Sequence, residues 1–216
     1  MEIRPTADGS FTIYVPELDE HYHSVNGAAQ ESTHVFLNAG FNYCEKSEIR
    51  VLELGFGTGL NALLTAIEAE KRKISTYYIT LEKFPLEEDV WIQLNYSSSD
   101  ETLFRKIHQA EWGTDVVVSP YFRIRKIRTD FADYSFPDIY DVVYYDAFAP
   151  DKQAGVWTQD LFNKIAARMS HAAILTTYCA KGAVRRMMQS AGLTVERIPG
   201  PPGKREMLRA LKIASP

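Results

Sequence analysis

A run of apolar residues followed at once by a glycine-rich turn constrains the fold of this chain more than any other feature. Residues 51–54 (Val-Leu-Glu-Leu) predict a buried strand, residues 55–59 (Gly-Phe-Gly-Thr-Gly) a tight turn, and residues 60–70 a helix. Glycines in such a turn let backbone amides approach a nucleotide-like ligand, because side chains there would collide with it. A tight strand-helix turn without a ligand is the alternative.

Two kinds of nucleotide site could use this turn, and the spacing separates them. The dinucleotide fingerprint requires glycine at the first, third and sixth positions. Counting from Gly55, the sixth position is Leu60, so that fingerprint fails. The pattern acidic-x-Gly-x-Gly-x-Gly instead resembles the first motif of S-adenosylmethionine-dependent methyltransferases. The resemblance implies that the turn admits the methionine and ribose parts of that cofactor, through Glu53, Gly55, Phe56, Gly57, Gly59 and Asn61.

The composition indicates a globular domain without targeting or metal-binding signals. The length of 216 residues suits one domain with small additions. No apolar run could span a bilayer and the N-terminus lacks a signal-peptide pattern, so we expect a cytoplasmic protein without a membrane partner. Cys44 and Cys179 are far apart and indicate free thiols in a reducing compartment. The five histidines show no ligand spacing, which predicts no metal site and a surface or structural role for His21 and His23.

The formal net charge of −4 conceals an asymmetry along the chain. Residues 1–120 carry 9 Lys and Arg against 19 Asp and Glu, whereas residues 121–216 carry 15 against 9. A basic C-terminal half can form a face that attracts phosphate groups, unless the two signs mix in space on folding.

Two basic groups are candidates for contact with a phosphate-bearing substrate. Lys181 and Arg185 stand four residues apart on one helical face, and Lys204 and Arg205 lie in a loop rich in Gly and Pro. Contact with solvent alone is the alternative for each group. Along the strand expected at 121–128, Arg123 and Arg125 share one face, while Lys126 and Arg128 share the other. The two faces cannot both point at one ligand, so part of this run should be a solvated edge.

Strand and helix patterns alternate after a small N-terminal extension. Residues 1–45 should form that extension, packed on the core formed by residues 46–216. Within the extension we expect a hairpin of strands at 2–5 and 11–15, a loop at 16–30 and a helix at 31–43. In the core we expect strands at 49–54, 74–81, 121–128, 140–146 and 172–178, helices at 60–70, 85–94, 101–110, 158–169 and 180–191, and a final strand pair at 193–198 and 206–212.

This alternation is typical of a parallel sheet covered on both faces. The final strand pair resembles the antiparallel hairpin that ends the class I methyltransferase fold. The fold implied is therefore α/β and Rossmann-like, with a seven-stranded sheet, a C-terminal antiparallel hairpin and a small N-terminal β/helical extension.

Acidic residues follow several of the expected strands, and in an open α/β sheet ligands lie beyond those carboxyl ends. Glu82 follows the second strand and can accept hydrogen bonds from ribose hydroxyls. Asp130 follows the third and can accept one from an adenine amino group, with Phe131 against the ring. Taken singly, each acid is better explained as a cap or as a solvated loop residue. Acids after successive strands beside a glycine turn favour a cofactor site.

Asp146, at the end of the fourth strand, is the candidate for the reacting group. Methyl transfer from a sulfonium is an in-line displacement, for which the protein must orient the nucleophile and remove its proton. A carboxylate there could hold an ammonium, orient the neutral amine and relay its proton, with Phe148 and Pro150 as pocket walls. The Asp-Ala-Phe-Ala-Pro sequence at 146–150 resembles the Asn/Asp-Pro-Pro-aromatic loop of amino-group methyltransferases. Capping of the next segment is the alternative role of Asp146.

Three blocks of the chain together resemble the MnmC-like family of tRNA methyltransferases. They are residues 53–61, residues 146–150 followed by Trp157 and Thr158, and residues 203–208 (Gly-Lys-Arg-Glu-Met-Leu). The segment 27–37, with Glu31, also resembles the N-terminal block of that family. The match therefore covers nearly the whole chain.

The resemblance implies S-adenosylmethionine-dependent N-methylation of the amine of 5-aminomethyl-(2-thio)uridine at the wobble position, in the anticodon region of tRNA. It implies that Asp146 is the active-site carboxylate, that Glu82 is the ribose ligand, and that Lys204 and Arg205 lie near the substrate. It does not settle the roles of Glu31 and Tyr178. Bifunctional members continue into a flavin-dependent oxidase domain and this sequence does not, so we expect a stand-alone methyltransferase whose aminomethyl substrate a separate enzyme supplies.

Two other functions remain open from the sequence. A small-molecule amine N-methyltransferase or an aminopropyl-transferring polyamine synthase would use a sulfonium cofactor on the same fold, and the acidic N-terminal half would suit a polyamine. A binding protein without turnover is the third alternative, which Asp146 beside an intact glycine turn disfavours. The basic loop at 203–205 favours the tRNA substrate.

Overall fold

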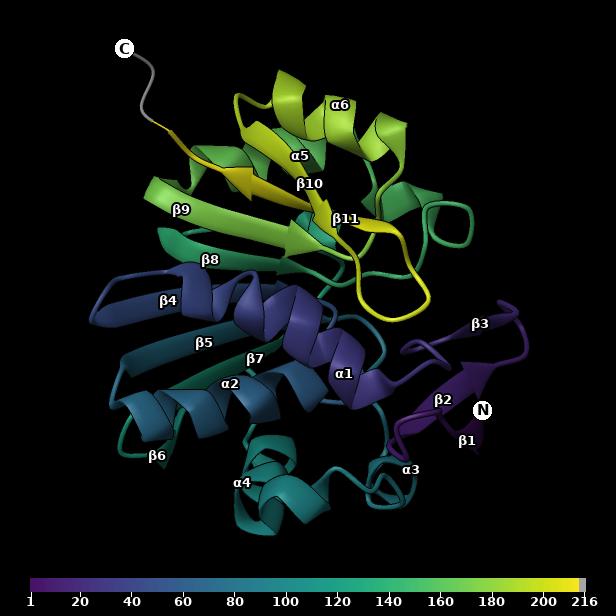
Figure 1. Cartoon of the computed structure of the whole chain (residues 1–216). Coiled ribbons are helices and arrows are strands. Elements are labelled where there is room, and N and C mark those ends of the chain that lie inside the picture. Colours follow the sequence, from purple (N-terminus) through teal and green to yellow (C-terminus); the bar gives the residue numbers. More distant parts are fainter. Residues whose placement is uncertain (214–216) are drawn as a thin grey trace.

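The computed structural model describes residues 1–213, without the side chains of residues 97–99. A single eight-stranded sheet separates two helical layers, in the order β10-β11-β9-β8-β4-β5-β7-β6 (Figure 1). Its strands are β4 (Glu48–Leu54), β5 (Ser75–Glu82), β6 (Asp115–Ser119), β7 (Phe122–Arg128), β8 (Tyr140–Tyr145), β9 (Met169–Thr177), β10 (Thr194–Pro199) and β11 (Glu206–Leu211).

Each face of the sheet packs against its own set of helices. One layer contains α1, a π-helix, α2 and α4, and the other contains α5 and α6 (Figure 1). Their bounds are α1 (Ala28–Ser32), the π-helix (Thr33–Asn38), α2 (Leu60–Arg72), α4 (Ser97–Gln109), α5 (Gln159–Ala167) and α6 (Gly182–Ser190). The short α3 (Glu88–Trp91) precedes α4, and 3-10 turns lie at Phe41–Tyr43, Phe131–Asp133 and Ala154–Val156.

The central strands are apolar on both sides because both faces of the sheet are covered. In β4, Val51 belongs to the cluster under α2, and its neighbour Leu52 belongs to the cluster under α5. Both side chains are fully buried. A mainly apolar run such as 51–54 therefore indicates a central position in the sheet.

The direction in which the chain is wound reverses beside β4. The chain passes from β4 outward through β5 to β7 on one side, and from β8 to β9 on the other, with all these pairs parallel. The carboxyl ends of β4 and β8 therefore diverge into different layers, which opens a crevice between them. The glycine turn follows β4 and Asp146 follows β8, so both lie at this crevice.

The expected class of fold is confirmed, with one strand more than expected. β10 and β11 pair antiparallel, and β11 pairs antiparallel with β9, as the C-terminal hairpin required. The sheet has eight strands instead of seven because β6 pairs antiparallel with β7 and becomes the edge. The apolar run of β6 is only Val116 to Val118, and Val117 is 72% exposed, so pairing with β7 and not burial defines this strand.

The N-terminal extension lies beside the carboxyl ends of the central strands (Figure 1). The expected hairpin is confirmed as β1 (Glu2–Pro5) and β2 (Phe11–Val15), and β3 (Glu20–His21) adds to β2 within the segment expected to be a loop. The helix expected at 31–43 instead begins at Ala28 and changes to π and 3-10 geometry. The helix expected at 85–94 shortens to α3.

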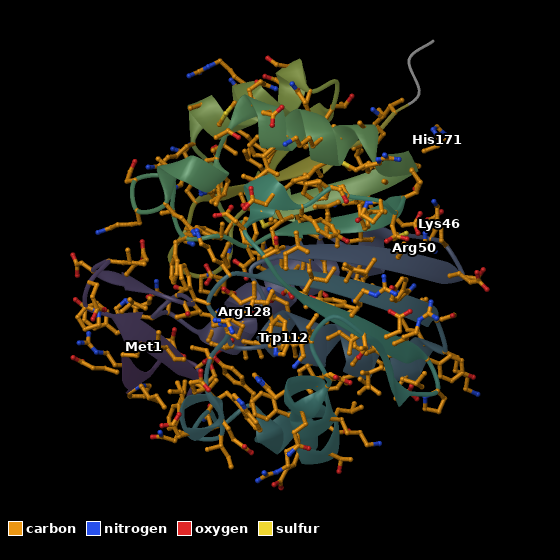
Figure 2. The ribbon with its side chains drawn as sticks, turned by 180° about the vertical axis from the view of Figure 1, so that it is seen from behind. Met1, Lys46, Arg50, Trp112, Arg128 and His171 are labelled. Atoms are coloured by element: carbon orange, nitrogen blue, oxygen red, sulfur yellow. The ribbon has the colours of Figure 1, made fainter. Side chains whose placement is uncertain are left out.

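Basic side chains of the C-terminal half mostly pair with acids, so the charges mix on folding. Arg125 pairs with Asp115 at 2.7 Å, and Arg209 pairs with Glu196 at 2.9 Å. In the expected basic edge Lys126 is instead buried, because its ammonium donates to the carbonyl oxygen of His108 and lies over the ring of Trp112. Lys46 and Arg50 lie at the amino end of β4, across the molecule from Met1 (Figure 2).

The helices and the two cysteines of the described residues bear on membrane insertion and on disulfide formation. Within residues 1–213, no helix combines the length and the apolar composition needed to cross a bilayer. Cys44 and Cys179 are both buried and unpaired, which confirms the expected free thiols.

The same isoleucine-to-alanine substitution at a buried and at an exposed position should show how much burial contributes to stability. Ile165 is fully buried between α5 and the sheet, whereas Ile139 is 45% exposed. We expect Ile165→Ala to lower the free energy of unfolding by about 2–5 kcal/mol, because it removes buried apolar surface and leaves a cavity. The matched control Ile139→Ala should cost less than about 1 kcal/mol. Urea denaturation measures both, and equal losses would contradict this view of the core.

Candidate active site

A cavity of about 430 Å³ opens at the carboxyl ends of the central strands. Three parts of the chain form its walls: the ends of the sheet strands, the N-terminal extension and the loop between β10 and β11. Its volume falls within the range of small-molecule sites. Among the described residues, no cluster of three or more His, Cys, Asp and Glu side chains could hold a metal ion.

Backbone geometry explains the glycines of the turn. Gly55, Gly57 and Gly59 all have positive φ, at +97°, +48° and +72°. A Cβ atom at Gly55 would also collide with the main-chain oxygen of Asp146. The turn therefore passes directly against the end of β8, which only glycine allows.

Two buried histidines hold Thr58, the residue between the second and third glycines. His23 Nε2 lies 2.6 Å from the Thr58 hydroxyl, and His108 Nε2 lies 3.1 Å from the Thr58 carbonyl oxygen. Burial lowers the pKa of His23 to about 4 and that of His108 to about 3, so both rings are neutral near pH 7. His108 must then carry its proton on Nε2, because a carbonyl only accepts. The contacts of His23 agree with the structural role expected for it.

Glu82 and Asp130 present carboxylates to the cavity from the ends of β5 and β7. Glu82 accepts hydrogen bonds from the amides of Gly57 at 3.0 Å and Phe84 at 2.8 Å, which fix its carboxylate beside the glycine turn. Asp130 accepts from Lys83 at 2.8 Å and from the backbone of the following 3-10 turn. The Lys83 ammonium lowers the pKa of Asp130, so this carboxyl is ionised.

Asp146 lies at the crevice between β4 and β8 and lines the cavity. Its carboxylate accepts a hydrogen bond of 2.8 Å from the side-chain amide of Asn61, which is 4% exposed on α2. Burial, together with the negative charge of Glu31, raises the pKa of Asp146 to about 7. Asp146 can therefore exchange a proton close to neutral pH.

Glu53 lies behind the turn and does not reach the cavity. Its side chain is fully buried, and one oxygen accepts a hydrogen bond of 2.6 Å from the Thr80 hydroxyl. Burial raises the pKa of Glu53 to about 8, so the protonated, neutral acid predominates at pH 7. The first acid of the motif thus braces β4 against β5.

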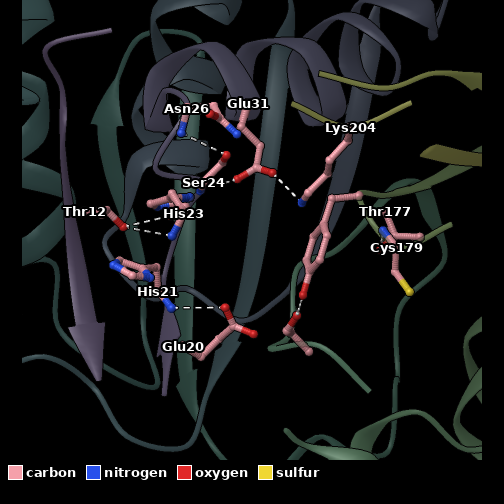
Figure 3. Close-up of polar contacts among 12 residues, drawn as sticks. Thr12, Glu20, His21, His23, Ser24, Asn26, Glu31, Thr177, Cys179 and Lys204 are labelled. Atoms are coloured by element: carbon pink, nitrogen blue, oxygen red, sulfur yellow. Dashed lines mark hydrogen bonds and ion pairs between the residues drawn. The ribbon is translucent and has the colours of Figure 1, made fainter. Parts of the chain in front are cut away.

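On the substrate side, the cavity gathers residues from distant segments. Phe148 packs edge-on against Tyr22, with ring centroids 5.0 Å apart. Lys204 donates to Glu31 at 2.7 Å (Figure 3). Its ammonium also lies 4.0 Å from the centre of the Tyr178 ring.

The cavity brings together many of the residues singled out in the sequence, but not all of them. Those that line it are Gly55, Phe56, Gly57, Glu82, Asp130, Phe131, Asp146, Phe148 and Lys204. Those outside its lining are Glu53, Gly59, Asn61, Pro150, Lys181, Arg185 and Arg205. Lys181, which directly precedes α6, pairs with Asp151. The side chain of Arg205, in the loop between β10 and β11, is exposed.

The sequence predicts no role at the site for several of the residues that line the cavity. Tyr178 follows β9, so the rule applied to the acids at the strand ends could have identified it. Tyr22, His23 and Glu31 also line the cavity, and they come from the extension. No pattern in the sequence indicates Tyr22 or His23 as site residues, and Glu31 is indicated only by the family resemblance of the segment 27–37. The packing of the extension brings all three to the cavity.

The strand order and the glycine turn define the class I fold of S-adenosylmethionine-dependent methyltransferases. Residues 123–213 match the family model described as "S-adenosyl-L-methionine-dependent methyltransferase", which names the expected cofactor. The solved structure of MnmC2 from Aquifex aeolicus superposes with a TM-score of 0.80 at 25% identity, covering 99% of this chain and 71% of that one.

The expected resemblance to MnmC-like proteins is confirmed. The tRNA 5-methylaminomethyl-2-thiouridine biosynthesis bifunctional protein MnmC of Paraburkholderia phymatum is 30% identical over 91% of this chain, and that of Cupriavidus necator is 28% identical over 90%. The chain spans about a third of the length of these relatives, 33% and 32% respectively. Spermidine synthase of Thermotoga maritima, with a TM-score of 0.57 at 10% identity, shares the fold.

A pair of glycine variants should isolate the contact between the turn and β8. Gly55 and Gly113 both have positive φ, at +97° and +84°, but no atom lies within 4 Å of a Cβ built at Gly113. We expect Gly113→Ala to lower the free energy of unfolding by about 1–2 kcal/mol through backbone strain. Gly55→Ala should cost at least about 1–3 kcal/mol more, because its Cβ meets Asp146. Equal losses in chemical denaturation would remove the contact as the reason for glycine.

Replacement of Glu53 by glutamine should change how stability depends on pH. The folded pKa of Glu53 lies near 8, above its ordinary value of 4.5. Its contribution to stability is therefore complete below pH 4.5 and is lost as the pH rises through 8. Relative to Glu53→Gln, the wild type should lose up to a few kcal/mol of unfolding free energy between pH 5 and 9. A constant difference between the two proteins, measured by urea denaturation at several pH values, would contradict the buried neutral acid.

Proposed function

We propose that this protein transfers a methyl group from S-adenosylmethionine to the amine of 5-aminomethyl-(2-thio)uridine at the wobble position of tRNA. The observation that carries the proposal is Asp146, held by Asn61 at the cavity and placed against the glycine turn. The similarity to MnmC proteins along about 90% of the chain supports the choice of substrate.

The residues of the cavity fit the cofactor. The glycine turn provides a floor free of side chains at Gly55 and Gly57, and the walls extend from Asp130 to Asp146. In the proposal Glu82 accepts from the ribose hydroxyls and Asp130 from the adenine amino group, with Phe131 beside the ring. Phe56, Gly59, Asn61 and Glu53 support the turn. The cofactor would supply the electrophilic methyl group.

Asp146 performs the proton chemistry in this proposal. The substrate amine arrives mainly as an ammonium, which has no lone pair and cannot attack. An ionised Asp146 attracts that ammonium, and its pKa of about 7 lets the carboxyl take a proton and leave the neutral amine hydrogen-bonded. Asn61 fixes the carboxylate through one oxygen, which leaves the other for the amine.

The tRNA would be held by basic residues around the cavity mouth. Lys204 and the exposed Arg205 lie in the β10–β11 loop, while Arg185 lies on α6 and Lys181 directly precedes that helix. The wobble base has to leave its stack to reach the cavity, where Phe148 forms one wall. Residues 1–45 complete the site of the domain formed by residues 46–216. Another enzyme active site must make the aminomethyl group of the substrate. The proposed location of the protein is the cytoplasm, where its tRNA substrate is found.

One observation favours a second candidate, an enzyme acting on a free polyamine. The cavity walls carry a concentration of acids, Glu20, Glu31, Glu82, Asp130 and Asp146. Such walls would attract a multiply charged amine, whether for methylation or for aminopropyl transfer.

Mass spectrometry of nucleosides from tRNA treated with the protein and labelled cofactor tests the proposal. We expect label on 5-aminomethyl-uridine, and a loss of about 10²–10⁴-fold in turnover for Asp146→Asn with cofactor affinity unchanged in calorimetry. The matched control Asp160→Asn, at a 74% exposed side chain on α5, should keep full activity. Label appearing only on added spermidine or its precursor would favour the second candidate, and full activity of Asp146→Asn would remove Asp146 from the chemistry.

A further inference from the structure

Glu31 is a buried carboxylate whose partners come from both ends of the chain. It is 5% exposed, and one oxygen accepts a hydrogen bond of 2.7 Å from the backbone amide of Ser24. The other oxygen accepts one of 2.7 Å from the ammonium of Lys204 (Figure 3). A carboxylate this deeply buried requires a cation, because leaving it unpaired costs several kcal/mol.

The same ammonium lies on an aromatic face inside the cavity. Lys204 Nζ is 4.0 Å from the centre of the Tyr178 ring, within the range of a cation–π interaction. The Tyr178 hydroxyl donates to the carbonyl oxygen of Ala147 at 2.8 Å. The ring therefore extends from the ammonium of Lys204 to the residue that follows Asp146.

Two carboxylates of the cavity, Glu31 and Asp146, are opposed here by one cation. Glu31 and Asp146 line the same cavity and influence each other, since the charge of Glu31 contributes to the raised pKa of Asp146. Lys204 is the cation that opposes both. An alkylammonium entering this space would find a carboxylate and an aromatic face already arranged for the head group of a lysine.

A lysine side chain and an aminomethyl group end in the same chemistry, a primary alkylammonium. We propose that Glu31 and the face of Tyr178 form a second ammonium subsite, which Lys204 occupies in the free protein and the substrate's ammonium occupies as it enters, before it passes to Asp146. Lys204 then turns outward to a phosphate of the bound tRNA. This inference rests on the proposed function for the identity of the substrate, but the subsite itself recognises any primary alkylammonium.

The exchange makes opposite predictions for two substrates of the same chemistry. Lys204→Met keeps the length of the side chain and removes its charge. For free 5-aminomethyluridine, which has no neighbouring phosphate, this variant should lower KM at least fivefold, because the internal competitor is gone. For tRNA the same variant should raise KM at least fivefold, because a phosphate contact is lost. Glu31→Gln should raise KM for both at least tenfold, with the cofactor affinity unchanged.

Two control variants test whether the effect comes from a general loss of positive charge or from a folding defect. Lys152→Met removes a lysine outside the cavity lining, where it lies 3.9 Å from Asp19, and should leave both KM values unchanged. The double variant Glu31→Gln/Lys204→Met removes both members of the buried pair, so it leaves no uncompensated charge and should fold as the wild type does. A KM for the nucleoside that rises with Lys204→Met as it does for tRNA would overturn the proposal.

A binding measurement without turnover separates this inference from the proposed function. Ethylammonium, compared with ethanol, can be titrated while the ring signals of labelled Tyr178 are followed by NMR, with Tyr178→Phe and Tyr178→Leu spectra used to assign them. We expect Lys204→Met to bind ethylammonium at least fivefold more tightly than the wild type, and the double variant to lose that gain. If tRNA is not a substrate but this pattern holds, the function fails and the subsite stands; equal affinities in all variants overturn the subsite.

Discussion

The close approach of the glycine turn to the end of β8 is the constraint on which the site depends. Gly55 lies against the main-chain oxygen of Asp146, while the amide of Asp146 donates to the carbonyl of Leu54 at 3.0 Å. These contacts join the end of β4 to the end of β8 at the place where the winding of the sheet reverses. The Asp146 carboxylate and the turn therefore share one rigid junction, and neither can shift without the other.

Burial sets the protonation of the groups around that junction. Glu53, behind the turn, has its pKa raised to about 8, while His23 and His108, on either side of Thr58, have theirs lowered to about 4 and about 3. Removal from water disfavours the charged form in each case, so the supports of the turn are neutral at pH 7. Asp146 faces the cavity with a pKa of about 7, which suits a group that must exchange a proton.

The sequence was sufficient for the central strands and the acids after them, but not for the edges of the molecule. β4 and β8 are apolar on both faces, and Glu82, Asp130 and Asp146 follow strands, so local patterns locate them. β6 has too short an apolar run to be predicted, since its pairing with β7 defines it. Lys126 could not be predicted to be buried either, because its environment is made by Trp112 and the carbonyl of His108, far away in sequence.

By itself the sequence determined the class of fold, the glycine turn and the acids at the strand ends, because each depends on residues adjacent in the chain. Only the tertiary structure decided which groups share the cavity with Asp146. Glu31 and Lys204 are separated by 173 positions and meet across the cavity, and Tyr178 reaches the same space from the end of β9. The physical reason is that an ion pair and a ring contact require proximity in space, and the packing of the extension and the C-terminal loop on the sheet creates that proximity.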